Sequence, residues 1–325
     1  MQLIHINENQ TSSNAIILKR LCFLTGLLSA IALTSCSKTN DSLNSDGEPA
    51  TAIQSDSSKT KSAVDKNLTQ LLQPSELDYQ DLEQLNRSIA EDSENQIAYS
   101  KRASIYNKLG RHEDAIADLN KAITLDESAE LYKHRAFTYG ELKQYEREIA
   151  DYNRALELKA AEHSSIGNEE IYRERGFAYF NLGQHEQAIA DFERYRTLDI
   201  LKKDSFVSGC LGSSYYYLGQ YEKAIAEFTR AITEAKGTES GTFRKRGDAY
   251  YQLRQYEKAI EDYDRAISMT PKHNLNYESR AAVHRKLGNT VRAKQDLAKA
   301  NSLYEQYKVK IGRYDYYCEI PPLSD

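Results

Sequence analysis

One short pattern recurs six times between residues 96 and 303, and this recurrence constrains the fold more than any other feature of the sequence. Each copy begins with tyrosine or histidine, has leucine three residues later, and in five copies reaches alanine six residues beyond that leucine. The leucines are 33, 40, 36, 35 and 34 residues apart. This period is typical of a solenoid, in which stacked units jointly bury the apolar faces that no unit can bury alone. The leucines are Leu109, Leu142, Leu182, Leu218, Leu253 and Leu287.

Apolar and small residues within each copy fall at helical intervals. In the third copy, Tyr172, Gly176 and Tyr179 follow one another after four and three residues, which places them on one face of a first helix. Ala188 and Phe192 mark the matching face of a second helix. The Leu-Gly link between them supplies a glycine where the first helix must end. Each unit is therefore predicted to be an antiparallel pair of helices.

Two regularities couple the predicted helices of each pair. A small residue of the first helix is followed 16 residues later by a bulky one, so the small residue would admit the bulky side chain. The pairs are Ala103 and Leu119, Ala136 and Tyr152, Gly176 and Phe192, Gly212 and Phe228, Gly247 and Tyr263, and Ala281 and Leu297. In five units an arginine just before the small residue is likewise followed by an aspartate, and we interpret this as an interhelical ion pair worth about 1 kcal/mol or less if exposed. These pairs are Arg102 and Asp118, Arg135 and Asp151, Arg175 and Asp191, Arg246 and Asp262, and Arg280 and Asp296, whereas the fourth unit has Leu211 and Glu227.

The repeated unit resembles the tetratricopeptide repeat, a unit of 34 residues with an aromatic residue near its start, Leu-Gly at the turn and alanines in the second helix. The resemblance implies an all-α fold, a right-handed superhelix of antiparallel helix pairs. Lys143 and Arg254 depart from it at the turn glycine, and Glu148 and Tyr195 depart from it at the two alanines. The spacing of 40 adds about six residues near 160–168, which predicts a longer loop or an extra helical turn.

The repeat sets the predicted domain boundaries. Residues 75–95 are expected to form a half-unit that caps the N-terminal end, and residues 304–325 a capping helix and tail, because solenoid ends need a polar outer face. The six units are predicted at about 96–128, 129–168, 169–204, 205–239, 240–273 and 274–303.

The first 35 residues are predicted to be an export signal. Lys19 and Arg20 precede an apolar run from Leu21 to Leu33 that is too short to span a bilayer comfortably. The run ends in LTSC, which resembles a bacterial lipobox and implies acylation of Cys36. The residue after this cysteine is not aspartate, which favours the outer membrane, facing the periplasm. A short anchor helix with an incidental cysteine is the alternative. Residues 36–74 are rich in Ser, Thr, Asn, Asp and Lys and are predicted to be a disordered, flexible tether.

Two cysteines remain after the signal and the acylated residue are set aside. An oxidising periplasm would permit a disulfide between Cys210 and Cys318. Because they would lie far apart along a solenoid, the sequence favours Cys210 as a small buried residue and disfavours the pairing.

Composition and motifs point away from several function classes. The net charge of −5 gives no general attraction to nucleic acid. No Cys/His cluster indicates a metal site, and the Leu-Gly motif follows a helix rather than the strand that a nucleotide-binding loop needs. We therefore expect no cofactor, no small-molecule substrate and no enzymatic activity.

The resemblance implies that the first helices line a concave binding face. Mapping the repeat onto this sequence predicts a mixed aromatic and basic surface that suits a peptide with apolar and acidic residues. Packing of the aromatic residues between units is the alternative. No asparagine occupies the ninth position of any unit, which disfavours a carboxylate clamp. The candidate residues are Lys101, Lys133, Phe137, Arg173, Phe177, Phe180, Tyr216, Tyr217, Arg244, Lys245, Tyr251 and Arg285.

These observations lead to two hypotheses. The first is a lipid-anchored scaffold that binds proteins or peptides of the cell envelope through the concave face. The second is a module that binds peptidoglycan or another glycan, suggested by the tyrosines of the same face.

Overall fold

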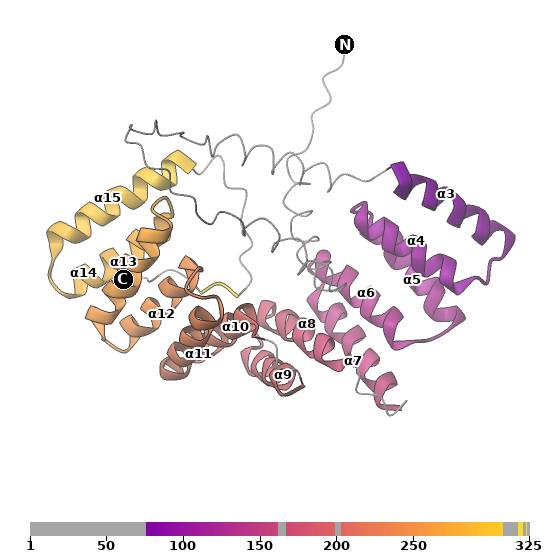
Figure 1. The fold of residues 1–325 in the computed structure, drawn as a ribbon, viewed down its shortest axis with the longest axis horizontal. Coiled ribbons are helices and arrows are strands. Elements are labelled where there is room, and N and C mark those ends of the chain that lie inside the picture. Colours follow the sequence, from indigo (N-terminus) through magenta and orange to yellow (C-terminus); the bar gives the residue numbers. More distant parts are fainter. Residues whose placement is uncertain (1–75, 162–166, 199–202, 308–317, 321–322, 324–325) are drawn as a thin grey trace, which may run out of the picture.

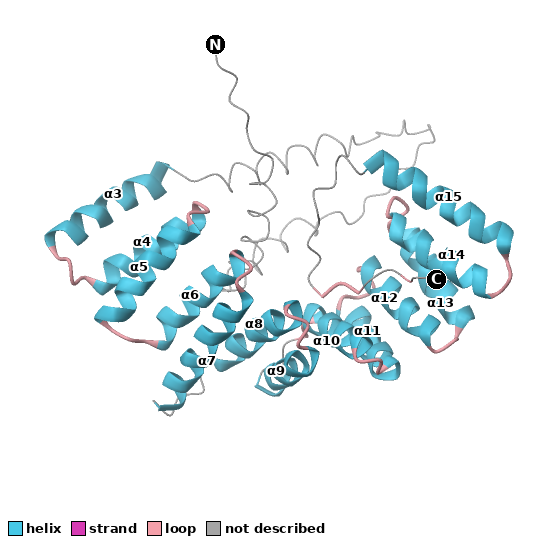
Figure 2. Cartoon of the chain, turned by 180° about the vertical axis from the view of Figure 1, so that it is seen from behind, coloured by secondary structure: helices cyan, strands magenta, loops and turns pink. Residues whose placement is uncertain are grey.

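A computed structural model describes residues 76–161, 167–198, 203–307, 318–320 and 323. The predicted signal, Cys36 and the whole predicted tether lie outside the described residues. Within them, the chain consists of helices joined by short loops, with no strand (Figure 2). The prediction of an all-α solenoid is confirmed.

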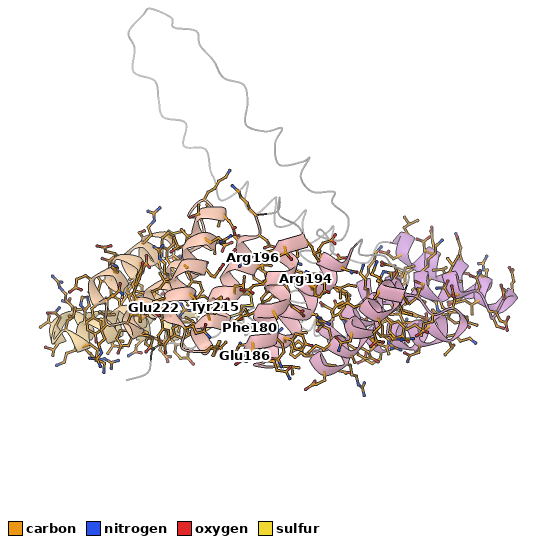
Figure 3. The ribbon with its side chains drawn as sticks, turned by 90° about the horizontal axis from the view of Figure 1, so that it is seen from below. Phe180, Glu186, Arg194, Arg196, Tyr215 and Glu222 are labelled. Atoms are coloured by element: carbon orange, nitrogen blue, oxygen red, sulfur yellow. A yellow bond between two sulfur atoms is a disulfide. The ribbon has the colours of Figure 1, made fainter. Side chains whose placement is uncertain are left out.

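The helices follow one another in a curved arc that runs from α3 to α15 (Figure 1). Helix α9 runs across the arc, so that Glu186 at its start and Arg196 near its end lie toward opposite edges (Figure 3). The bounds are α3 Glu76–Glu91, α4 Gln96–Lys108, α5 His112–Leu125, α6 Ala129–Glu141, α7 Tyr145–Ala161, α8 Asn168–Asn181, α9 His185–Leu198, α10 Ser205–Tyr217, α11 Tyr221–Glu234, α12 Ser240–Gln252, α13 Tyr256–Met269, α14 Asn274–Lys286 and α15 Thr290–Tyr307.

The even-numbered helices α4 to α14 are the first helices of the six units, and the odd-numbered α5 to α15 are the second helices. Helix α3 precedes them alone. Helix α7 has 17 residues where α5 and α9 have 14, so part of the long spacing is an extra helical turn. Helix α15 continues without a break to Tyr307, so the first residues of the predicted C-terminal cap extend the sixth unit.

The turn inside each unit requires a left-handed residue. At Gly183 φ is +73°, and its N–H donates to the Phe180 carbonyl while the next N–H donates to the Tyr179 carbonyl. Both bonds satisfy carbonyls at the end of the first helix. Lys143 and Arg254 occupy the same turn position with φ of 58°. The repeat therefore imposes a left-handed backbone even where the sequence lacks glycine.

The predicted coupling of small and bulky residues is confirmed. A Cβ built on Gly176, Gly212 or Gly247 would lie 2.6–2.7 Å from the ring of Phe192, Phe228 or Tyr263. The ring of the second helix thus lies directly against the backbone of the first. The second unit has a similar close contact at another position of its first helix. There the buried Glu148 carboxylate lies directly against Gly140, too close for a Cβ at that position.

The five predicted arginine–aspartate pairs are present, and each is bidentate. In every pair the arginine Nε and Nη2 donate to the two aspartate oxygens over 2.7–2.8 Å. The aspartates are buried, so these are not the exposed pairs for which a small contribution was expected. In the fourth unit Leu211 is buried, and Glu227 instead accepts from Arg196 Nη1 of the preceding unit over 2.8 Å.

Each of these arginines also reaches the preceding repeat. Its Nη1 donates to a side chain of the second helix one step earlier, and its guanidinium lies 5.2–5.9 Å from the centroids of aromatic rings on its own helix. We call this arrangement the arginine clamp. The Nη1 acceptors are Asn86 for Arg102, Asn120 for Arg135, Asn153 for Arg175, Thr229 for Arg246 and Asp264 for Arg280.

The close contact in the fourth unit leads to a first prediction. Gly212→Ala should destabilise the protein by about 1–3 kcal/mol, because the new methyl group overlaps the buried Phe228 ring. Gly209→Ala on the same helix is the matched control. Nothing lies within 4 Å of a Cβ there, so it should be neutral or stabilise by about 0.5–1 kcal/mol. Denaturant unfolding measures both, and equal effects at the two sites would contradict the packing described.

The arginine clamp leads to a second prediction. Arg175→Ala should destabilise by about 3 kcal/mol, because it leaves the buried Asp191 carboxylate without its guanidinium partner. In a double-mutant cycle with Asp191→Ala, the second substitution should cost far less once the first is present. A coupling energy of about 1 kcal/mol or more in chemical unfolding is expected, and strict additivity would refute the clamp.

Candidate functional site

The residues predicted to bind a partner lie on the first helices α4 to α14, and several of the aromatic ones are buried. Phe177, Phe180 and Tyr216 belong to the core between the third and fourth units. The ring centroid of Phe177 lies 5.1 Å from that of Phe206 on α10, the first helix of the next unit. These three side chains therefore pack between units, as the alternative interpretation of the sequence allowed.

The other predicted aromatic residues are more accessible. Tyr217 is 43% exposed and stacks on His185 with the ring centroids 4.4 Å apart. Tyr251 is partly buried against Tyr256, with 5.8 Å between ring centroids, and Phe137 is also partly buried. Of these aromatic side chains, Tyr217 offers the most surface to a ligand.

The predicted basic residues divide into paired and exposed groups. Lys133 lies 3.1 Å from both Glu130 and Glu170; burial opposes its charge, but the two carboxylates outweigh burial and raise its pKa. Arg173 pairs with Glu174 and with Asp204, 3.1 Å from the latter. Lys101 and Arg285 are exposed. The basic character of this face is thus partly neutralised within the chain.

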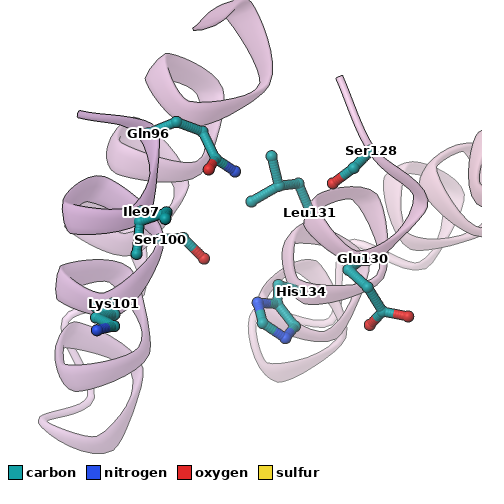
Figure 4. Close-up of a pocket in the computed structure, with 8 residues that line it drawn as sticks. All are labelled: Gln96, Ile97, Ser100, Lys101, Ser128, Glu130, Leu131 and His134. Carbon is teal, nitrogen blue, oxygen red and sulfur yellow. The ribbon is translucent and has the colours of Figure 1, made fainter. Parts of the chain in front are cut away.

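A pocket of about 290 Å³ lies on the N-terminal part of the arc, between α4 and α6 (Figure 4). Ile97 and Lys101 face it from α4, and Leu131 and His134 face it from α6 (Figure 4). Ile97 is 61% exposed, so this pocket presents apolar surface next to a cation. It combines the two features that the sequence predicted for a peptide-binding surface.

The C-terminal segment occupies the inner side of the arc farther along. Cys318 is bonded to Cys210 of α10, 108 residues earlier, with the two Cα atoms 5.0 Å apart. The prediction that these cysteines stay unpaired is wrong. The prediction assumed that Cys318 lies beyond the sixth unit, far from Cys210. Instead, the C-terminal segment comes back along the arc, and Cys318 lies against the fourth unit (Figure 1).

Side chains of α10 and α12 bind the backbone of this segment. The Cys318 carbonyl accepts from Ser213 Oγ over 2.6 Å and from Lys245 Nζ over 3.0 Å. The Glu319 carbonyl accepts from the Tyr217 hydroxyl over 2.9 Å. The backbone turns at Cys318, where φ is 57°, and side chains of α10 and α12 hold two consecutive main-chain carbonyls.

The side chains of the segment are bound as well. The Glu319 carboxylate pairs with Arg244 and with Lys245, 3.0 Å from the Lys245 Nζ. Ile320 is buried in the core of the third and fourth units, and Leu323 packs against the core of the fifth. Three of the predicted partner-binding residues, Tyr217, Arg244 and Lys245, therefore contact the chain's own C-terminal segment.

Electrostatics favour an acidic side chain at this position. Arg244 is 1% exposed and pairs with Asp248 over 2.7 Å, and Tyr263 donates to the same aspartate over 2.7 Å. Arg244, Lys245 and Asp248 together carry one net positive charge, which Glu319 neutralises. Burial raises the pKa of Glu319, but Lys245 and Arg244 outweigh burial and hold that pKa below its ordinary value.

Sequence reasoning missed the site of Cys318, although α10 carries a signal. This helix lacks the clamp arginine and instead contains Gly209, Cys210, Gly212, Ser213 and Ser214. Small residues on an inner helix leave room for another chain segment. Together with the two cysteines left after the predicted signal and the predicted acylation site, they could have indicated where Cys318 lies.

No group of three or more His, Cys, Asp or Glu side chains among the described residues could hold a metal ion. No described helix combines the length and apolar character that crossing a bilayer requires.

Comparison with known families agrees with the geometry of the helix pairs. Residues 97–128 and 242–273 match one family profile described as tetratricopeptide repeat, and residues 129–162, 170–199 and 211–237 match a second with the same description. The chain is a tetratricopeptide repeat protein. A search of curated protein sequences found no significant match to it.

Solved structures of tetratricopeptide repeat proteins share the fold. YrrB, described as having an unusual peptide-binding site, is 23% identical and superposes with a TM-score of 0.52 over 59% of this chain and 95% of its own. MamA from Desulfovibrio magneticus RS-1 is 18% identical, with a TM-score of 0.50 over 55% and 96% of the chains. The Cut9–Hcn1 hetero-tetramer of APC/C is 16% identical, with a TM-score of 0.50 over 70% and 43%. At these identities the likeness concerns the fold alone.

Proposed function

We propose that this tetratricopeptide repeat protein is a non-enzymatic scaffold that binds other proteins or peptides of the cell envelope through the inner side of its arc. The observation that carries the proposal is the bound C-terminal segment. Its carbonyls and its carboxylate are held by the first helices of the fourth and fifth units, and its isoleucine is buried in the core of the third and fourth units. A surface that holds one segment of chain in this way has the chemistry to hold others.

The pocket between α4 and α6 is the part of this face where we propose that a partner binds. The exposed Ile97 supplies apolar surface above the buried Leu131, and Lys101 supplies a charge that attracts acidic residues. A segment with an aliphatic side chain beside a carboxylate fits both. YrrB, which has the same fold, is described as having a peptide-binding site, and a peptide is the kind of ligand proposed here.

The glycan hypothesis has less support from the same face. Carbohydrate binding commonly relies on exposed aromatic surface, but Tyr216 is buried and the hydroxyl of Tyr217 is bonded to the Glu319 carbonyl. A protein or peptide partner therefore remains the preferred proposal.

The binding surface can be tested with a matched pair of substitutions. Ile97 is 61% exposed and Val291, on the second helix α15, is 69% exposed. We expect Ile97→Asp to reduce capture of a cross-linked partner at least tenfold, because it places a charge in the apolar pocket, while Val291→Asp leaves capture unchanged. Once identified, the partner should bind the purified full chain directly. The native chain and Val291→Asp should bind it with similar affinity, and Ile97→Asp should bind it more weakly.

Two results would argue against this proposal. Equal capture by the native chain and by Ile97→Asp would place the partner elsewhere. Sedimentation of the purified chain with peptidoglycan, without any added protein, would favour the glycan hypothesis instead.

We further propose that the protein is anchored by lipid on Cys36, in the outer membrane and facing the periplasm. The support is the apolar run followed by LTSC, and the polar residues 36–74 would let the repeats reach partners away from the bilayer. Cys36→Ser should abolish incorporation of labelled palmitate and shift the protein from the membrane fraction to the soluble fraction. Retention of Cys36→Ser in the membrane fraction would contradict the anchor, and Cys22→Ser serves as the control that keeps both label and location.

A further inference from the structure

The C-terminal segment is held by side chains of α10 and α12, and we call this surface the seat. Its residues are Ser213, Tyr217, Arg244 and Lys245. The segment and the seat differ in character from the rest of the repeat core. Repeats pack through side chains at fixed positions of the 34-residue pattern, whereas Cys318 and Glu319 are held by their backbone carbonyls. The groups that hold them come from the inner positions of α10 and α12, where a partner peptide would be bound in this architecture. The segment therefore occupies the position, and makes the kind of contacts, that are expected of a bound peptide ligand.

The seat is specific for what it holds. Ser213 and Tyr217 donate to the consecutive carbonyls of Cys318 and Glu319, and the backbone at Cys318 is left-handed, with φ of 57°. Arg244 and Lys245 receive the next carboxylate, and the buried Ile320 follows directly. The geometry therefore selects an acidic residue followed by a branched aliphatic residue.

Vacating the seat would leave an uncompensated charge. In the ion pairs of the described residues, Arg244 has Asp248 as a second partner, and Glu319 is the one carboxylate within 4 Å of Lys245. With Arg244 and Lys245 protonated and Asp248 ionised, an empty seat would carry net positive charge beside an apolar site, which favours another anionic ligand.

We propose that the Cys318–Ile320 segment is a tethered competitor that closes this seat while the Cys210–Cys318 disulfide is intact, and that reduction opens the seat to an external peptide with an acidic residue followed by a branched aliphatic residue. This inference rests on the proposed function, because it assumes that the inner side of the arc binds peptides. It adds a second site, its ligand class and a chemical gate.

The gate requires a dithiol as the reductant. One thiolate of the dithiol attacks a sulfur of the disulfide, and the Cys210–Cys318 bond breaks as a mixed disulfide forms. The second thiol of the reductant then displaces that sulfur. Two electrons and two protons pass to the cysteines, which end as two thiols, and the dithiol ends as a disulfide. Cys210 and Cys318 are 1% and 2% exposed, so a small dithiol will act more readily than a large one.

After reduction, the internal segment still competes with an external peptide for the seat, but this competition then depends on the concentration and affinity of each. A short tether gives it an effective concentration on the order of millimolar, whereas the covalent bond keeps it in place at any ligand concentration. Affinity for an external peptide should therefore rise in two steps, first on reduction and again when the contacts of the internal segment are weakened.

The probe for this test is a fluorescent peptide with the sequence YYSEIPPL, which corresponds to residues 316–323 with serine in place of cysteine. Binding to the purified full chain is measured by fluorescence anisotropy before and after treatment with a small dithiol, and thiol alkylation followed by mass measurement confirms the redox state. We expect at least tenfold tighter binding after reduction. The double variant Cys318→Ser, Glu319→Gln should bind more tightly still, and without any reductant.

Two matched controls test specificity. The peptide YYSQIPPL, which lacks the carboxylate, should bind at least tenfold more weakly than the glutamate peptide. Lys245→Met in the double-variant background should lose the preference for glutamate while keeping its helical circular dichroism. If Lys245→Met loses helicity, Tyr217→Phe takes its place as the test variant. It removes a single hydrogen bond and should weaken binding of the peptide by a smaller factor.

Three outcomes would overturn the inference. Equal binding by oxidised and reduced chains would place the peptide elsewhere, and no binding to the folded double variant would make the segment a structural cap. A disulfide-linked dimer under non-reducing conditions would assign the segment to a second copy. None of these results bears on capture of a partner through Ile97 and Lys101. Failure of this inference can therefore be distinguished from failure of the proposed function.

Discussion

The arginine clamp is the interaction on which the rest of the solenoid depends. One guanidinium joins the two helices of its own unit through the bidentate aspartate and reaches the second helix of the preceding unit through its third nitrogen. Aromatic rings of its own helix flank it. Such a group cannot form all these contacts unless both the helix pair and the stacking of units are correct. The same residue therefore specifies local and inter-repeat geometry, which a purely apolar contact does not.

The fourth unit lacks this clamp, and the structure compensates there in a different way. Leu211 replaces the arginine, and small residues along α10 make room on the inner side of the arc. The disulfide from Cys210 closes a loop of 108 residues, a constraint worth about 4–5 kcal/mol in the chain-entropy view. Nine of the thirteen residues of α10 are buried, compared with three in α4 of the same length. The unit without a clamp is thus the one covered by the C-terminal segment.

The two halves of the inner face now have distinct properties. Toward the N-terminal end, the pocket between α4 and α6 is open and carries an exposed isoleucine. Toward the C-terminal end, Arg244 and Lys245 are neutralised by Glu319. A basic and aromatic groove that looks uniform in the sequence is therefore divided into an open part and an occupied part. The proposed scaffold function concerns the first, and the proposed redox gate concerns the second.

The sequence by itself determined the architecture, because the repeat is written in local spacings. Leucines about 34 residues apart, small and bulky residues 16 apart, and arginines and aspartates at the same interval all report contacts within one helix pair, whose geometry is fixed by the helical period. The turn positions were equally predictable, and Lys143 and Arg254 adopt the left-handed backbone that their place in the repeat requires.

Only the tertiary structure decided which of the inner residues are available and where the chain returns. Burial of Phe177 and Tyr216 depends on how closely neighbouring units stack, which no spacing within a unit encodes. The Cys210–Cys318 bond joins residues 108 positions apart that belong to different parts of the pattern. Periodicity describes contacts between neighbours in the repeat, and a segment outside the repeat is free of that rule, so its position had to come from the three-dimensional fit of Glu319 between Arg244 and Lys245.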